Sequence, residues 1–141
     1  MVVVIDDGNV NRYDIFFDKE EDTFTFPAEM EPLMVGVDEG FQIPKRLTFE
    51  KKTNELLYQL KNAPVPNDRI WAARELKDTR STKKIHNVLV AMLSAEPKWY
   101  VRKEIVKTYQ SLKPRNGAAD LMAAYDGQDD RVKRAIIGAL R

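Results

Sequence analysis

Side chains that could perform catalysis or hold a metal ion are few in this sequence. It contains one histidine, His86, and no cysteine. A zinc peptidase site of the H-E-x-x-H type needs two imidazoles at helical spacing and a glutamate base, so this chain cannot supply one. A serine nucleophile would also depend on His86, and no G-x-S-x-G motif offers the serine. We therefore predict no catalytic, cofactor-binding or metal-binding residue, and we expect His86 to be structural or solvated.

Four carboxylates gather in residues 18–22 (DKEED). They could attract calcium, but they lack the alternating D-x-D-x-D-G spacing that wraps the ion. We expect a solvated hairpin loop there, and no cofactor in this chain. The lack of cysteine excludes disulfides and thiolate metal sites, and it does not decide the compartment. A cytoplasmic location is our expectation, with periplasmic and secreted locations left open.

Basic side chains are numerous in the second half of the chain, where they could contact nucleic acid or an acidic peptide. They are spread over several predicted helices and mixed with acids rather than gathered into a stripe with aromatic residues, which argues against nucleic acid. No apolar run approaches membrane-spanning length, so we expect no membrane partner. The bases considered are Lys83, Lys84, Lys98, Arg102, Lys103, Lys107, Lys113 and Arg115.

The 141 residues are 43% hydrophobic and 32% charged, which is typical of a soluble, folded protein. Charge divides the chain unevenly. Residues 1–50 hold 12 Asp and Glu against 4 Lys and Arg, whereas residues 51–141 hold 10 against 19. We interpret this asymmetry as a sign of two structural units.

Residues 1–50 have the pattern of β structure, with short runs rich in Val, Ile, Phe and Tyr between turn formers. Residues 6–9 (DDGN) predict a tight turn, and residues 18–22 predict a hairpin connection. Pro27 and Pro32 interrupt the pairing, because proline has no N–H to donate. The predicted strands are residues 1–5, 12–17, 22–27, 33–38 and 46–50.

The pattern becomes helical at Thr53, and Pro64 and Pro66 separate the first helix from the next. Further helices are predicted over residues 68–79, 81–93, 99–112, 117–125 and 131–140. The predicted N-caps are Asn67 or Asp68 for the second helix and Ser81 or Thr79 for the third.

Three of these helices repeat one pattern, a base followed by apolar residues at the third, fourth and seventh positions after it. An offset of 33 places Arg69 on Arg102, and a further 31 places them on Lys133. We expect each to be the first helix of a pair that buries one face against the next pair, so that the chain ends after one helix of a third pair. The aligned apolar residues are Ala72, Ala73 and Leu76, then Ile105, Val106 and Tyr109, then Ile136, Ile137 and Leu140.

This pattern resembles HEAT-type repeats, whose loose signature has Asp, then Val-Arg or Val-Lys, then small apolar residues. Asp129, Val132, Lys133 and Ala135 fit it, whereas the first two repeats lack the Asp. The predicted fold class is α+β, a small N-terminal antiparallel sheet or half-sandwich followed by an α-α superhelix of HEAT-like pairs. We expect a β-sandwich-like domain at residues 1–50 and a helical domain at residues 51–141 that is truncated at its C-terminus.

A second resemblance covers residues 23–78. Its features are a Phe-rich strand, VGVD ending at Asp38, LTFEK, ELLYQL and the helix that carries Arg69 and Leu76. This stretch resembles aminopeptidase N-like zinc metallopeptidases where their β-sandwich domain meets the C-terminal helical domain. Pro44 departs from that pattern, because an aliphatic residue is expected at its position.

The resemblance implies a parent enzyme that uses zinc to remove N-terminal amino acids from peptides. This chain would be a non-catalytic C-terminal fragment of it, packed on the catalytic domain of the same parent chain and walling the cleft for peptide substrates. Zinc would belong to that parent, and no catalytic position of the family has a counterpart here. The alternatives are a HEAT-repeat scaffold or adaptor that binds proteins, and a catalytically silent relative of the peptidases.

Overall fold

The computed structural model describes residues 1–6, 9–16, 18–28 and 30–140. The chain separates into two compact units, Met1–Lys51 and Lys52–Arg141, which we describe one at a time. The first holds a β-sheet and the second holds helices, so the predicted α+β class is confirmed. None of the helices in the described ranges is long and apolar enough to cross a membrane.

The sheet of the first unit has three antiparallel strands within the described residues: β1 (Val2–Asp6), β2 (Asn9–Tyr13) and β3 (Met34–Val37). The order is β2-β1-β3, with Val3 opposite both Arg12 and Gly36. The apolar run of β1 is almost fully buried, as expected for a central strand.

The prediction of five strands is wrong. Residues 1–5 and 33–38 do contain strands, but the second strand lies earlier than predicted and ends at Tyr13; Phe17 is outside the described residues. Residues 22–27 and 46–50 form no strand, and the hairpin at 18–22 is therefore wrong too. Phe-rich alternation favours a strand only where a neighbour completes the ladder. Phe26 instead packs its ring on Tyr13 of β2, with centroids 4.8 Å apart.

The predicted turn at residues 6–9 includes Asp7 and Gly8, which lie outside the described residues. The residues on either side of them, Asp6 and Asn9, are paired in the antiparallel register of β1 and β2.

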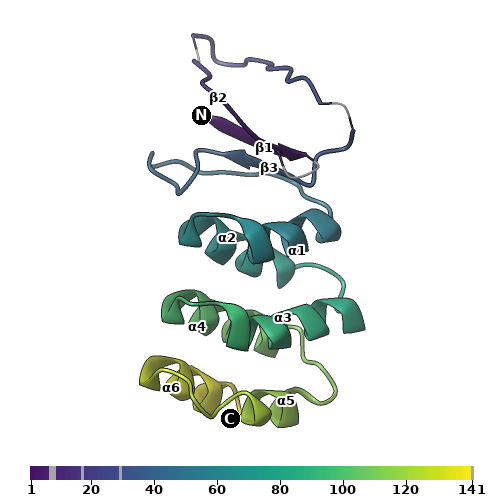
Figure 1. Cartoon of the computed structure of the whole chain (residues 1–141), viewed down its shortest axis with the longest axis vertical. Helices are drawn as coiled ribbons and strands as arrows, with labels where there is room; N and C mark the ends of the chain where they lie inside the picture. The colour runs from purple at the N-terminus through teal and green to yellow at the C-terminus, as the bar shows by residue number, and fades with distance from the viewer. Residues whose placement is uncertain (7–8, 17, 29, 141) are drawn as a thin grey trace. The chain divides into compact units, whose positions relative to one another are not determined.

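Six helices are described in the second unit, and they lie in three layers (Figure 1). The layers are α1 (Thr53–Asn62) with α2 (Pro66–Leu76), α3 (Lys83–Ala95) with α4 (Trp99–Ser111), and α5 (Gly117–Ala123) with α6 (Asp130–Ala139). Across the layers, α2 packs closely on α4 and α4 on α6, whereas α1 and α3 touch at few positions.

These layers correct the predicted phase of the repeat. The helices with the basic-apolar pattern, α2, α4 and α6, are the second members of their pairs rather than the first, because α2 packs on the preceding α1. The third pair accordingly consists of α5 and α6, and α6 is not the unpaired first helix that we expected. A sequence offset shows that a helical pattern recurs, but it does not show whether each helix pairs with the helix before it or the helix after it.

Two helix starts also differ from prediction. Helix α2 begins at Pro66 after Val65, because proline suits the first helical position, where its missing N–H costs no hydrogen bond. Thr82 caps α3, and its hydroxyl oxygen accepts a hydrogen bond from the backbone N–H of Ile85 at 3.4 Å.

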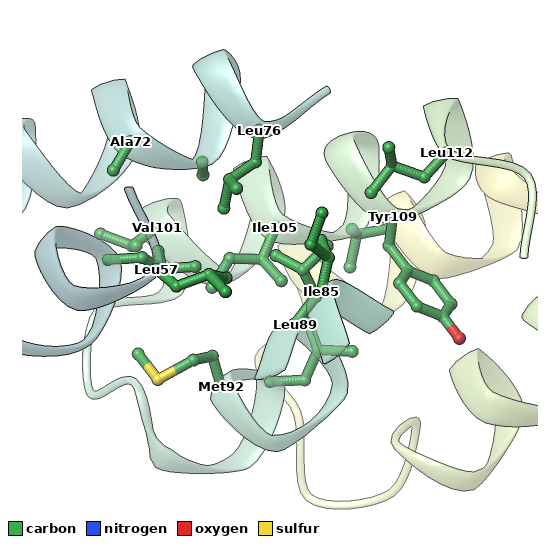
Figure 2. Close-up of a cluster of buried hydrophobic side chains, with 14 of the residues drawn as sticks. Leu57, Ala72, Leu76, Ile85, Leu89, Met92, Val101, Ile105, Tyr109 and Leu112 are labelled. Atoms are coloured by element: carbon green, nitrogen blue, oxygen red, sulfur yellow. The ribbon is translucent and has the colours of Figure 1, made fainter. Parts of the chain in front are cut away.

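The core of the helical unit joins all six described helices, and Figure 2 labels members from α1, α2, α3 and α4. The matched apolar residues of α2 and α4 are buried, as predicted. In α6, Ile136 is buried, but Ile137 is 44% exposed and Leu140 is 37% exposed, so the third repeat follows the pattern only in part. The same offset of 33 would set Leu89 of α3 on Met122 of α5, but the two helices do not match there, because Leu89 is buried whereas Met122 is 52% exposed.

Candidate interaction surface

His86 lies near a serine, but in an arrangement opposed to nucleophilic catalysis. Its Nε2 is 2.7 Å from the hydroxyl oxygen of Ser81. The Ser81 hydroxyl donates its one proton to the carbonyl of Leu112, 3.1 Å away, so His86 Nε2 is the donor to Ser81. A nucleophilic serine would have to donate to the histidine instead. The ring of His86 meets the ring of Tyr109 edge-on, which is a packing contact.

Tyr109 joins α4 to α5 through its hydroxyl, which donates a hydrogen bond to the carboxylate of Asp120. Burial raises the pKa of Tyr109, and the hydrogen bond and negative charge of Asp120 raise it further. The phenol therefore stays protonated through the neutral range and acts as a donor, so it has a structural role.

The acids of residues 18–22 all belong to the described residues, and they form no metal site among these. Across the described ranges, no group of at least three His, Cys, Asp or Glu side chains is placed to hold a metal ion.

A cluster of bases does emerge on the side of α2, α4 and α6 that faces solvent. Helices α2 and α4 turn their matched apolar residues inward and α6 turns Ile136 inward, so positions on the opposite side of each helix are exposed. The repeat offsets align Arg74 with Lys107 and Lys103 with Arg134. We name as the basic face the exposed residues Arg74, Lys103, Lys107, Arg131 and Arg134.

Glu104 neutralises part of the basic face between α2 and α4. Its carboxylate accepts from Arg74 Nε at 3.1 Å and pairs with Lys107 Nζ at 3.3 Å. Burial alone would raise the pKa of Glu104, but the hydrogen bond and charge of Arg74, with the charge of Lys107, hold it below its usual value. The carboxylate therefore stays ionised and bridges the two helices.

Arg131 is also held in place. It forms an ion pair with Asp129 at 2.9 Å, and its guanidinium lies 3.7 Å from the centre of the Trp99 ring, a cation–π contact. The hydrogen bond from Arg131 lowers the pKa of Asp129 well below its usual value. Lys103 and Arg134 differ, because neither has an ion pair within the part of the chain that the structure describes.

Sequence reasoning identified only part of this face. It named Lys103 and Lys107, but it missed Arg74, Arg131 and Arg134. The repeat offset would have found Arg74 and Arg134 had it been applied to exposed positions as well as to the apolar ones, whereas it places Arg131 on Tyr100. Other predicted bases lie elsewhere, and Lys84 donates to Asn54 at 2.7 Å.

The comparisons with known proteins agree with this architecture. The family model for HEAT repeats matches residues 53–141. The chain belongs to the HEAT-repeat family. No match is found among curated proteins or among solved structures. The predicted HEAT-like domain is therefore confirmed, whereas none of these comparisons supports the aminopeptidase N-like parent or its zinc.

Successive layers of this HEAT array are joined by buried arginines. Arg69 of α2 reaches Glu96 at the end of α3, donating from Nε at 2.7 Å and from the second terminal nitrogen at 3.0 Å. Its other terminal nitrogen donates to the carbonyl of Ala63 at 2.7 Å. Both side chains are largely removed from solvent, so the first layer is fixed to the second by a bidentate, charge-assisted contact.

Arg102 of α4 makes the corresponding contact to the third layer with a weaker acceptor. One terminal nitrogen donates to the side-chain oxygen of Gln128 at 2.7 Å, and the Gln128 amide donates to the Leu93 carbonyl at 2.9 Å. Because an amide has one oxygen where a carboxylate has two, the buried Nε of Arg102 has no hydrogen-bond partner among the described residues.

Proposed function

We propose that this HEAT array is a scaffold that binds a partner protein across the solvent side of α2, α4 and α6. The observation that carries the proposal is the presence of five exposed bases on the solvent side of these three closely packed helices. Stacked helical repeats present extended surfaces that suit the binding of another chain.

The opposite row of helices offers a contrasting surface. Apart from Lys83 and Lys84 in the first turn of α3, the exposed positions of α3 and α5 are occupied by uncharged residues, among them Asn87, Ala91, Ser94, Ala119 and Ala123. Beyond that first turn, such a surface has no charge with which to attract or orient a partner. The two faces therefore supply an internal control.

Photo-crosslinking tests the proposal. A benzophenone amino acid placed at Tyr100 on α4, one turn before Lys103, is compared with one at Asn87 on α3, since both positions are exposed, lie in the same layer and leave the five bases in place. We expect one discrete protein adduct from position 100 in the source cells, lost on competition with unlabelled wild-type chain and reproduced with the purified partner. Equal adducts from both positions, or none from position 100, would contradict the proposal.

The resemblance of residues 23–78 to aminopeptidase N-like enzymes supports a narrower alternative, in which the partner is the catalytic domain of the same parent chain. The parent reading frame would then encode H-E-x-x-H upstream of Met1 for an active enzyme, or a disrupted motif for a silent relative. Deleting residues 53–141 from such an enzyme should change which peptide lengths it accepts, and unchanged selectivity would reject the alternative.

A further inference from the structure

The basic face has one half between α2 and α4 and another between α4 and α6, and the two halves differ in the residue at one repeat position. Between α2 and α4, Glu104 supplies the chain's own carboxylate to Arg74 and Lys107. An offset of 31 places Glu104 on Ala135 of α6. The bases shared by α4 and α6 therefore have no internal carboxylate at the corresponding position.

Lys103 and Arg134 occupy equivalent positions on neighbouring helices, and both are exposed. Packed helices have axes about 8–10 Å apart, so two long basic side chains on adjacent helices can reach the same acidic group or two adjacent ones. Asp130 lies one turn before Arg134, but it forms no ion pair within the described residues. The positive charges of Lys103 and Arg134 are thus available to a ligand.

We infer that the α4–α6 half of the basic face binds an acidic segment of the partner protein, whose carboxylates contact Lys103 and Arg134 as Glu104 contacts Arg74 and Lys107. This inference rests on the proposed function and names the chemistry of the partner. The Glu104 contact shows within the same molecule that this surface can hold a carboxylate between bases of two helices.

A nucleic acid is the competing ligand. Glu104 lies within the face, and a polyanion following the helix row would have to pass its ionised carboxylate. A short acidic segment needs only the bases of α4 and α6 and avoids that repulsion. The charge pattern therefore favours a peptide.

The test measures fluorescence anisotropy of a labelled glutamate-rich peptide with the full chain, beside a single-stranded oligonucleotide of equal charge. We expect Lys103→Gln combined with Arg134→Gln to weaken peptide binding about tenfold, since two charge contacts are lost. The matched control, Lys61→Gln with Lys83→Gln, removes the same net charge from exposed positions of α1 and α3 and should change binding by less than about twofold.

Two further variants change the internal carboxylates of the basic face, one by adding a carboxylate on α6 and the other by removing the one on α4. Ala135→Glu should place an internal competitor beside Arg134 and weaken peptide binding, whereas Glu104→Gln should release Arg74 and Lys107 and strengthen it about threefold. Glu104→Gln keeps the inference testable if Ala135→Glu does not fold, as judged by circular dichroism.

Equal loss in the control pair, unchanged binding in the Lys103 and Arg134 pair, or tighter binding of the oligonucleotide would each overturn the inference. If the acidic peptide fails while the crosslink from position 100 persists, only the acidic chemistry is wrong and the scaffold proposal stands. If the crosslink is lost as well, both fail.

Discussion

The two junctions between helix layers share one design but differ in their acceptors. At the first junction, Arg69 meets a carboxylate that accepts two hydrogen bonds, whereas at the second Arg102 meets an amide that accepts one. The second junction compensates in part through the Tyr109 to Asp120 bond. Both junctions therefore keep an arginine contact at the same place in the repeat, but the two contacts differ in strength. We predict that the third layer is attached to the second less firmly than the first layer is.

Breaking the first junction should have the largest effect. Glu96→Ala leaves the buried guanidinium of Arg69 without its carboxylate, and we expect a loss of about 3 kcal/mol in the free energy of unfolding. Urea denaturation followed by circular dichroism measures it, as a lower midpoint with an unchanged slope. A loss smaller than that of the second-junction variant below would contradict the ranking of the two junctions.

The corresponding change at the second junction is Gln128→Ala. It removes the acceptor of Arg102 and the donor to the Leu93 carbonyl, and we expect a loss of about 2 kcal/mol. Hydrogen exchange should locate the effect, with faster exchange in α5 and α6 and little change in α1 and α2. Uniform acceleration over all the helices would show that the layers unfold as one unit.

Alkaline pH should also weaken the second junction. The pKa of Tyr109 is raised above its ordinary value of 10.0, so above that pH the unfolded chain loses the proton while the folded chain keeps it. The stability that Tyr109 contributes is therefore complete below pH 10.0 and is lost as the pH rises. Tyr109→Phe should cost about 1 kcal/mol at neutral pH and give a shallower alkaline decline. Urea denaturation at a series of alkaline pH values gives the free energy of unfolding against pH for both proteins. An equal decline with pH in the two would reject this account.

The smallest effect is expected for the second link across the first junction, between Arg74 and Glu104. Arg74 is exposed, with 57% of its side-chain surface accessible, so solvent screens the pair. Glu104→Ala should lower the free energy of unfolding by less than about 1 kcal/mol, measured by urea denaturation beside Glu96→Ala. A loss equal to that of Glu96→Ala would show that burial is not what separates the two links.

The sequence predicts the helices well, because each needs only its own period and its own start and stop residues. Pro64 and Pro66 ended one helix and permitted the next. Strand assignment was weaker, since residues 22–27 have strand-like composition but no neighbouring strand to pair with. Pairing depends on contacts far apart in the chain, and local pattern does not contain them.

The candidate surface was predictable only in part for a related reason. The apolar positions of the repeat predict which residues form the core. The positions on the opposite side of each helix predict the basic face, but only once α2, α4 and α6 are known to lie parallel in one row. The sequence shows that the third repeat has Ala135 at the position where the second repeat has Glu104. Its meaning depends on the contacts of Glu104 with Arg74 and Lys107, which the structure supplies.

Unequal packing of the two helix rows has a mechanical consequence. Contact is continuous along α2, α4 and α6, whereas α1 and α3 touch at few positions. Under tension the sparse row can widen only by shifting the core side chains of α1 and α3, while the dense row behaves as a hinge line. Bending of the array should therefore change the gaps between α1, α3 and α5 while the spacing of the bases on α2, α4 and α6 stays nearly constant.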